Sequence, residues 1–197
     1  MILKPITLQD LPSLLTAFER GLAGEPAALS AFGRIAGTLH FAPQLIADLH
    51  AGRDKAISLA QRLNIPTLDE DPATAFSWDG HAIRTTSETS VVFHEIAHWQ
   101  IAPVERRSLY DFGLGAGPET GRIFEANAVA CVDDAIKEDE ENLASLLGIL
   151  WEADHGEPAI IAFAEQNWLE LADRAHTPRH FVQCLGRLAQ RGLIASL

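Results

Sequence analysis

His94, Glu95 and His98 form an HExxH pattern within the run 91–101, the part of the sequence best suited to chemistry. In a helix, the two histidines lie one turn apart on the same face, so both imidazoles can bind one metal ion. Glu95 lies about 100° around the helix from His94. In zinc hydrolases with this pattern, that glutamate is the general base. The spacing therefore predicts a metal site at His94 and His98, with Glu95 as the candidate catalytic residue.

The residues around this pattern favour a buried helix. Between Ser90 and Ala102 the only charged side chain is Glu95, and Pro103 ends the helical stretch. A helix that is apolar on nearly every side is buried. Polar groups buried there without partners would cost several kcal/mol. A bound metal ion would supply those partners.

A metal ion here needs a third protein ligand, and Glu125 is the leading candidate. It follows His98 after a connection long enough to let a second helix fold back across the first, and it stands between apolar neighbours. Asp133 lies two turns further along the same helical face, which favours a role in holding a ligand over binding the ion. The rival ligands are Asp111, Glu119, Asp133 and His155.

Two histidines and one carboxylate with open coordination positions suit two chemistries. Zinc would activate water for hydrolysis, with Glu95 as the base. Iron(II) in the same arrangement would activate dioxygen for hydroxylation. A third, non-enzymatic alternative is a binding module in which a closed metal site with a fourth protein ligand only joins two helices. The ligand types leave these alternatives open.

Composition bounds the class of protein. A chain of 197 residues that is 47% hydrophobic and 21% charged is typical of one globular domain, here predicted over 1–197. No apolar run approaches the roughly 20 residues that span a bilayer, and the N-terminus lacks the features of a signal peptide. We therefore expect a cytoplasmic protein without a membrane partner. A net charge of −12 weighs against a nucleic-acid partner.

The pattern of apolar residues predicts a mainly α (α+β) fold, a single helical domain. The predicted helices cover 11–22, 26–37, 43–49, 54–63, 88–102, 119–136, 138–152, 158–175 and 178–190. Asp79-Gly80 stands between two short extended runs, 75–78 and 81–86, which predicts a small antiparallel β-hairpin. A small sheet beside a buried HExxH helix is a metallopeptidase-like arrangement.

Several short motifs around the HExxH pattern agree with one known family. They are His94–Ala102, Arg106-Arg107, Asp111–Gly113, Gly121-Arg122 and Phe124-Glu125. In these residues and their spacing, the segment 90–130 resembles the elongation factor P hydroxylases. These are bacterial non-haem metal enzymes that hydroxylate the modified lysine of that translation factor.

The resemblance implies a metal-dependent, Fe(II)-using hydroxylase with a protein substrate. It implies His94, His98 and Glu125 as the metal ligands, with Glu95 beside the ion. Arg106, Arg107 and Asp111 also match the family pattern, and an arginine–carboxylate bridge holding their loop against the metal helix is the expected structural role. Zn(II) in a hydrolase remains the alternative.

The sequence departs from the family in two places. Leu114–Gly117 replaces an aromatic-rich stretch, and Ala128 stands where a second acidic residue is expected. The motif residues at the metal are kept while the loop over it differs. The substrate is therefore left open between elongation factor P and another protein.

Overall fold

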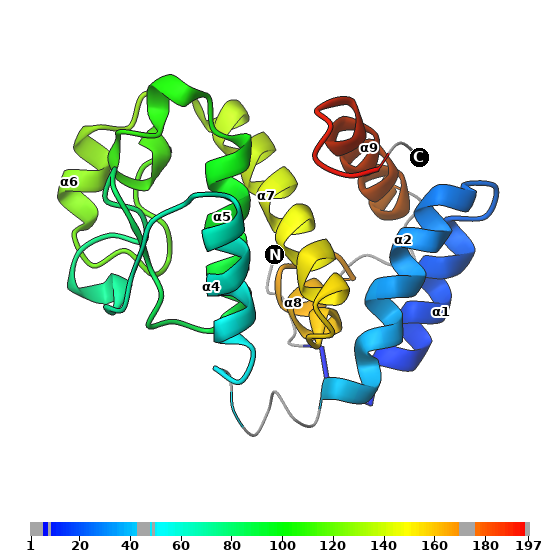
Figure 1. Cartoon of the computed structure of the whole chain (residues 1–197). Coiled ribbons are helices and arrows are strands. Elements are labelled where there is room, and N and C mark those ends of the chain that lie inside the picture. The colour runs from blue at the N-terminus through cyan, green and yellow to red at the C-terminus, as the bar shows by residue number, and fades with distance from the viewer. Residues whose placement is uncertain (1–5, 8, 43–47, 49, 170–175, 196–197) are drawn as a thin grey trace. The chain divides into compact units, whose positions relative to one another are not determined.

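The computed structural model describes residues 6–7, 9–42, 48, 50–169 and 176–195. Its contacts divide the chain into two compact units, Met1–Pro43 with Ile149–Leu197, and Gln44–Gly148. The units are called the terminal unit and the central unit below, and each is described by itself. The predicted mainly helical class is confirmed (Figure 1). The single domain over 1–197 stays a prediction.

The terminal unit is built from helices around an aromatic core. Phe18, Phe32, Phe163 and Phe181 bury their rings against one another, with ring centroids 4.9 to 6.0 Å apart. Its elements are α1 (Leu11–Gly21), α2 (Pro26–Ala36), η1 (Gly37–Phe41), the end of α7 (Asp134–Asp154), α8 (Ala159–Glu165) and α9 (His176–Gln190). The helix predicted over 43–49 lies, apart from Asp48, outside the described residues, as does 170–175 of the one predicted over 158–175.

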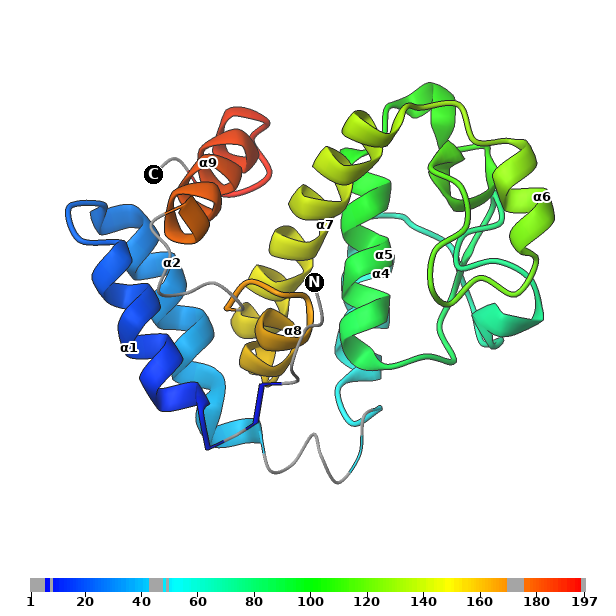
Figure 2. The ribbon, with the colours of Figure 1, turned by 180° about the vertical axis from the view of Figure 1, so that it is seen from behind.

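The central unit carries the HExxH helix. Helix α5 (Thr89–Ile101) has buried Val92, Phe93, Ile96 and Ala97 on several sides, which confirms the prediction of a buried helix. Helix α4 (Arg53–Arg62) contacts it, and the two lie side by side in Figures 1 and 2. The other elements are η2 (Pro72–Thr74), η3 (Val104–Arg106), η4 (Tyr110–Gly113), α6 (Ile123–Ala128) and the start of α7. None of the helices in the described part of the chain has the length and apolarity that crossing a bilayer requires.

The predicted antiparallel hairpin is wrong, because the small sheet is parallel. Strand β1 (Thr67–Leu68) pairs with β2 (Ile83–Arg84), with Thr67 opposite Ile83 and Leu68 opposite Arg84. The Asp79-Gly80 turn does reverse the chain, since Asp79 Oδ1 accepts two backbone N–H bonds and one antiparallel bridge joins Trp78 to Ile83. The second strand then takes its main partner from 66–68, a segment that lies outside the predicted helices and the predicted hairpin.

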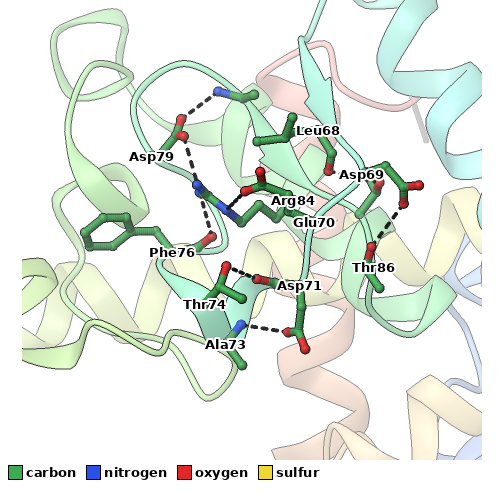
Figure 3. A network of polar contacts seen from close by, with 12 residues as sticks. Leu68, Asp69, Glu70, Asp71, Ala73, Thr74, Phe76, Asp79, Arg84 and Thr86 are labelled. Atoms are coloured by element: carbon green, nitrogen blue, oxygen red, sulfur yellow. Dashed lines mark hydrogen bonds and ion pairs between the residues drawn. The ribbon is translucent and has the colours of Figure 1, made fainter.

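Side-chain bonds hold this loop-rich region together more than its two-residue strands do. Figure 3 shows Arg84 at the centre, donating to the carboxylates of Glu70 and Asp79 at 3.2 Å each and to the carbonyl of Phe76 at 3.3 Å. The Arg84 side chain is only 10% exposed. Arginine can bridge three acceptors because its guanidinium carries five donors in a fixed plane. The network fixes the segment that leads into α5.

The helix predicted over 119–136 is also wrong in extent. Only α6 forms, because the chain turns away after Ala128 and the backbone N–H of Cys131 donates to the carbonyl of Gly113 at 3.0 Å. Asp133 then accepts the N–H of Ile136 at 2.8 Å, a side-chain cap that starts α7. Helix α7 runs over Asp134–Asp154, so the helix predicted over 138–152 is confirmed and is longer.

Candidate metal centre

Three side chains from two helices of the central unit converge on one point. The Nε2 atoms of His94 and His98, both on α5, lie 2.9 Å apart. Each Nε2 lies 3.3 Å from Oε2 of Glu141 on α7. Among the described residues, this is the group of three that is suited to holding a metal ion.

The donor set fits a divalent ion. Ligand atoms at about 2.1 Å from one ion lie about 3.0 Å apart when they are neighbours in an octahedron and about 3.4 Å apart in a tetrahedron. The observed separations of 2.9 and 3.3 Å fall at these values. The distances suit both zinc and iron(II).

Glu141 is ionised in this arrangement. Partial burial raises its pKa, but hydrogen bonds from His94 and His98 and their charges outweigh burial and hold the pKa well below its usual range. Burial lowers the pKa of His94, and the charge of His98 adds to this. Burial also acts to lower the pKa of His98, but the hydrogen bond and charge of Glu141 raise it overall. In the absence of an ion, the hydrogen bonds from the two imidazoles therefore favour the ionised form of Glu141.

The three side chains differ in exposure, and this leaves the site reachable. The His98 side chain is 5% exposed, that of His94 20% and that of Glu141 40%. An ion bound here would have protein on the histidine side and solvent on the glutamate side. Three protein ligands and an open side are the mark of a catalytic site, whereas a structural zinc site has four protein ligands.

Gly148 lets the two helices approach closely enough to build this site. A Cβ at Gly148 would lie 3.1 to 3.2 Å from backbone atoms of His94 and Phe93. Glu141 lies two turns before Gly148, on the same face of α7. The close contact at the glycine therefore brings the carboxylate to the two imidazoles, and a larger residue would push α7 away from α5.

Glu95 lies beside this triad as the sequence predicts. Its side chain is partly exposed, yet burial raises its pKa to about 8, opposed by His98 and helped by the charges of Asp111 and Glu141. Without an ion, Glu95 is therefore largely protonated at neutral pH. A carboxyl group with a raised pKa next to a reactive centre is typical of general acid–base residues.

A turn with unusual backbone geometry packs on His98. Asp111, Phe112 and Gly113 have consecutive positive φ angles of 43°, 56° and 70°. Left-handed conformations are strained for a bulky residue such as phenylalanine. The Phe112 ring lies over the imidazole of His98 with centroids 5.7 Å apart, and Trp78 stacks on its other side at 5.3 Å.

Asp111 anchors this turn and does not bind the candidate ion. It is 6% exposed, and it accepts the backbone N–H of Trp78 at 3.2 Å and the hydroxyl of Thr120 at 2.5 Å. Burial raises its pKa, although both hydrogen bonds oppose the rise. The motif Asp111–Gly113 thus forms one wall of the candidate metal centre.

The two adjacent arginines make different contacts. Arg106 donates to the carbonyl of Phe112 at 2.9 Å and forms an ion pair with Glu140 on α7. Arg107 donates to the carbonyl of Ala102 at 3.1 Å and places its guanidinium over the ring of Trp99 at 3.9 Å. The expected arginine–carboxylate bridge is present, but it joins the loop to the Glu141 helix and not to the HExxH helix.

The structure does not bring Glu125, the expected third ligand, to the histidines. Glu125 lies on α6, where its carboxylate accepts two bonds from Arg122 at 2.9 and 2.6 Å. The hydrogen bond from Arg122 holds the pKa of Glu125 below its usual range. Glu141 takes the place beside the two histidines that was predicted for Glu125. The connection after His98 is long enough for a return crossing, but it is α7 that makes this crossing.

The remaining candidates also have other roles. Asp133 is exposed, and its carboxylate caps the start of α7. This contact differs from the predicted role of holding a metal ligand in place. Glu119 is exposed on the loop before α6, although its charge helps to raise the pKa of Glu95. His155 lies in the terminal unit and bonds through Nδ1 to the carbonyl of Trp151 at 2.7 Å.

Sequence reasoning missed Glu141 because the run Lys137–Glu141 has the composition of a solvated helix start. The feature that could have identified Glu141 is its position in the sequence. Glu140 and Glu141 are the last acidic residues before the largely apolar stretch 143–150, in which every residue is buried. An acid at the border of a buried helix face can reach a neighbouring helix. Periodicity does not reveal which helix that is.

A separate pocket of about 550 Å³ has Tyr110, Phe76, Arg84 and Arg122 among its lining residues. Tyr110 stacks on Phe76 at 4.0 Å, and the guanidinium of Arg122 lies over the same Phe76 ring at 5.4 Å. The arginines that line the pocket, Arg84 and Arg122, are both already paired with carboxylates. Their charges are therefore neutralised locally, and the pocket does not favour an anion.

Comparison with known proteins adds no relative. No protein-family model, curated protein or solved structure matches the chain.

Proposed function

We propose that the chain is a metal-dependent enzyme that hydroxylates a side chain of a protein substrate, with its ion held by His94, His98 and Glu141. The observation that carries the proposal is the convergence of these three donor atoms, with the Glu141 side chain 40% exposed. Iron(II) held by two histidines and one carboxylate supplies dioxygen activation. The chain's own residues orient the imidazoles and keep Glu141 ionised.

The resemblance to the elongation factor P hydroxylases supports the hydroxylase assignment. Its motif residues are not scattered in space: Asp111–Gly113 packs on His98, and Arg106 reaches the helix that carries Glu141. Glu141 replaces Glu125 as the proposed third ligand. A cytoplasmic location and a protein substrate, elongation factor P or another, belong to this proposal.

The test is a mass measurement on the substrate. Protein loaded with iron(II) is incubated with lysylated elongation factor P, dioxygen and a two-electron reductant such as ascorbate, because one oxygen atom enters the substrate and the other leaves as water. Intact-mass spectrometry looks for one added oxygen atom. We expect the gain with the wild type and its loss with Glu141→Ala, while Glu125→Ala retains it. Lack of gain on elongation factor P and on a panel of other lysylated or lysine-bearing proteins would reject hydroxylation.

A zinc-dependent hydrolase is the second candidate, favoured by the position of Glu95. Glu95 directly follows His94 on the HExxH helix, and its charge interacts with those of His98 and Glu141, which is the position that carries the general base in zinc hydrolases with this pattern. Glu95→Gln separates the two functions. A zinc hydrolase should lose activity on a peptide library by about 100-fold or more while its zinc content is unchanged. A hydroxylase should keep its iron and its oxygen-dependent product.

A further inference from the structure

Arg106 joins the two chain segments that build the candidate metal centre. One end of its guanidinium donates to the carbonyl of Phe112, whose ring lies over His98. The other end pairs with Glu140, the residue directly before Glu141. The same side chain thus contacts the neighbour of a proposed histidine ligand and the neighbour of the proposed carboxylate ligand.

The pair between Arg106 and Glu140 is buried. The two side chains are 11% and 9% exposed, and Oε2 of Glu140 has no hydrogen-bond partner in the part of the chain that the structure describes. Arg106 is therefore the cation that compensates this buried carboxylate. Loss of that cation would leave Glu140 charged and desolvated, and the first turns of α7 would move to bring it to water.

The strained turn depends on the same arginine. The Phe112 carbonyl belongs to a residue with a φ of 56°, inside a run of three left-handed residues. Such a conformation persists only where surrounding contacts hold it. A Cβ at Gly113 would also lie 3.7 Å from Cδ of Arg106, so the turn packs along the arginine stem.

We propose that Arg106 is a positioning residue of the metal centre. It fixes the distance between the Asp111–Gly113 turn, which packs on His98, and Glu141 on α7. This inference rests on the proposed metal site. Residues outside the ligand set that hold ligands in place typically change metal affinity by about 10- to 100-fold when they are replaced. Lysine at this position would keep the charge but would lose the planar fork that reaches both acceptors.

Arg107 is a matched control on the same loop. It has the same charge and the adjacent position, but its contacts are the Ala102 carbonyl and the Trp99 ring, both at the end of α5. Arg106→Lys and Arg107→Lys therefore make the same chemical change at two different places. Arg106 is bonded to α7, whereas the contacts of Arg107 named above are on α5.

The experiment titrates cobalt(II) alone into the full chain without oxygen and records affinity and the visible absorption of the bound ion. That absorption reports coordination number and symmetry, which a loss of overall stability does not alter. We expect Arg106→Lys to weaken cobalt binding by about 10- to 100-fold and to change the spectrum. Arg107→Lys should keep the wild-type spectrum and lose clearly less affinity than Arg106→Lys, because the Arg107 side chain contacts α5 at Trp99 and Ala102 but does not join α5 to α7.

Glu140→Gln provides the second variant, since it removes the charge at the other end of the same bond. It should reproduce the loss, and the double variant Arg106→Lys/Glu140→Gln should be no weaker than the worse single variant. Wild-type affinity and spectrum in Arg106→Lys, or in Glu140→Gln where Arg106→Lys does not fold, overturn the positioning role alone. Absence of cobalt binding in the wild type overturns the metal centre and, with it, this inference.

Discussion

On helix α7, the surroundings of two glutamates, Glu141 and Glu152, shift their pKa values in opposite directions. In the central unit, Glu141 faces two imidazoles, and their hydrogen bonds hold its pKa below its usual range despite partial burial. In the terminal unit, Glu152 is 1% exposed, and burial raises its pKa to about 8, helped by the charges of Glu157 and Glu165. One acid is ionised at neutral pH and the other is largely protonated.

The difference lies in what the neighbouring helix offers. Helix α5 presents two histidines with the spacing i, i+4, so lone pairs and protons are available to Glu141. The core of the terminal unit is built from phenylalanine rings. Among the described residues, Oε2 of Glu152 has no hydrogen-bond partner. Burial alone favours a neutral acid, whereas hydrogen bonds from imidazoles favour the ionised carboxylate that a metal ligand requires. The following predictions test this contrast, from the largest expected effect to the smallest.

Glu141→Gln should weaken zinc binding by more than about 100-fold, because it replaces the anionic ligand by a neutral amide of the same size. Glu152→Gln should leave the affinity within about 2-fold, since Glu152 is not in the ligand group. Competition with a chromophoric chelator measures both. Equal affinities for the two variants would remove the distinction between the two acids.

Glu152 should make the protein less stable as pH rises. The folded-state pKa of Glu152 is raised. Its contribution to the free energy of unfolding is therefore fully present below the usual pKa of 4.5, declines as the pH rises from 4.5 to about 8, and is lost above that. Each pKa unit corresponds to about 1.4 kcal/mol. Urea unfolding at pH 5 and pH 9 should show a loss on the order of a few kcal/mol in the wild type.

Glu152→Gln supplies the control for this pH dependence, because the amide does not titrate. The variant should lose less stability than the wild type between the two pH values, and the loss that remains includes the contribution of Glu95, whose pKa is also raised to about 8. If the wild type and the variant change in parallel, another group is responsible.

Gly148→Ala should lower the free energy of unfolding by about 1–2 kcal/mol and weaken zinc binding, because its Cβ would meet the α5 backbone at 3.1 to 3.2 Å. Gly33→Ala is the matched control, since Gly33 is also helical, is exposed and has no atom within 4 Å of its added Cβ. That variant should gain about 0.5–1 kcal/mol from helix propensity. Thermal unfolding with and without zinc measures both effects. A Gly148→Ala variant that binds zinc normally would show that α7 can shift without moving Glu141.

Glu125→Gln should have the smallest effect, a change in zinc affinity below about 2-fold. Its carboxylate is exposed and pairs with Arg122 three residues earlier, the kind of surface ion pair that contributes little. The same chelator assay applies. A loss comparable to that of Glu141→Gln would restore Glu125 as the third ligand.

The sequence by itself determined the features that depend on local spacing. The one-turn separation of His94 and His98 places both imidazoles on one face of any helix, and the uncharged run around them requires that this helix be buried. The Asp79-Gly80 reversal was predictable for the same reason, since Asp79 caps backbone N–H groups only a few residues away.

Only the tertiary structure decided which segments meet. The pairing of β1 with β2, the end of α6 after Ala128 and the choice of Glu141 over Glu125 all depend on contacts between residues far apart in sequence. Apolar periodicity marks the face that a helix buries but not the helix that it packs against. Here the absence of a side chain at Gly148 permits that close packing, and the two turns between Gly148 and Glu141 carry the carboxylate to the histidines.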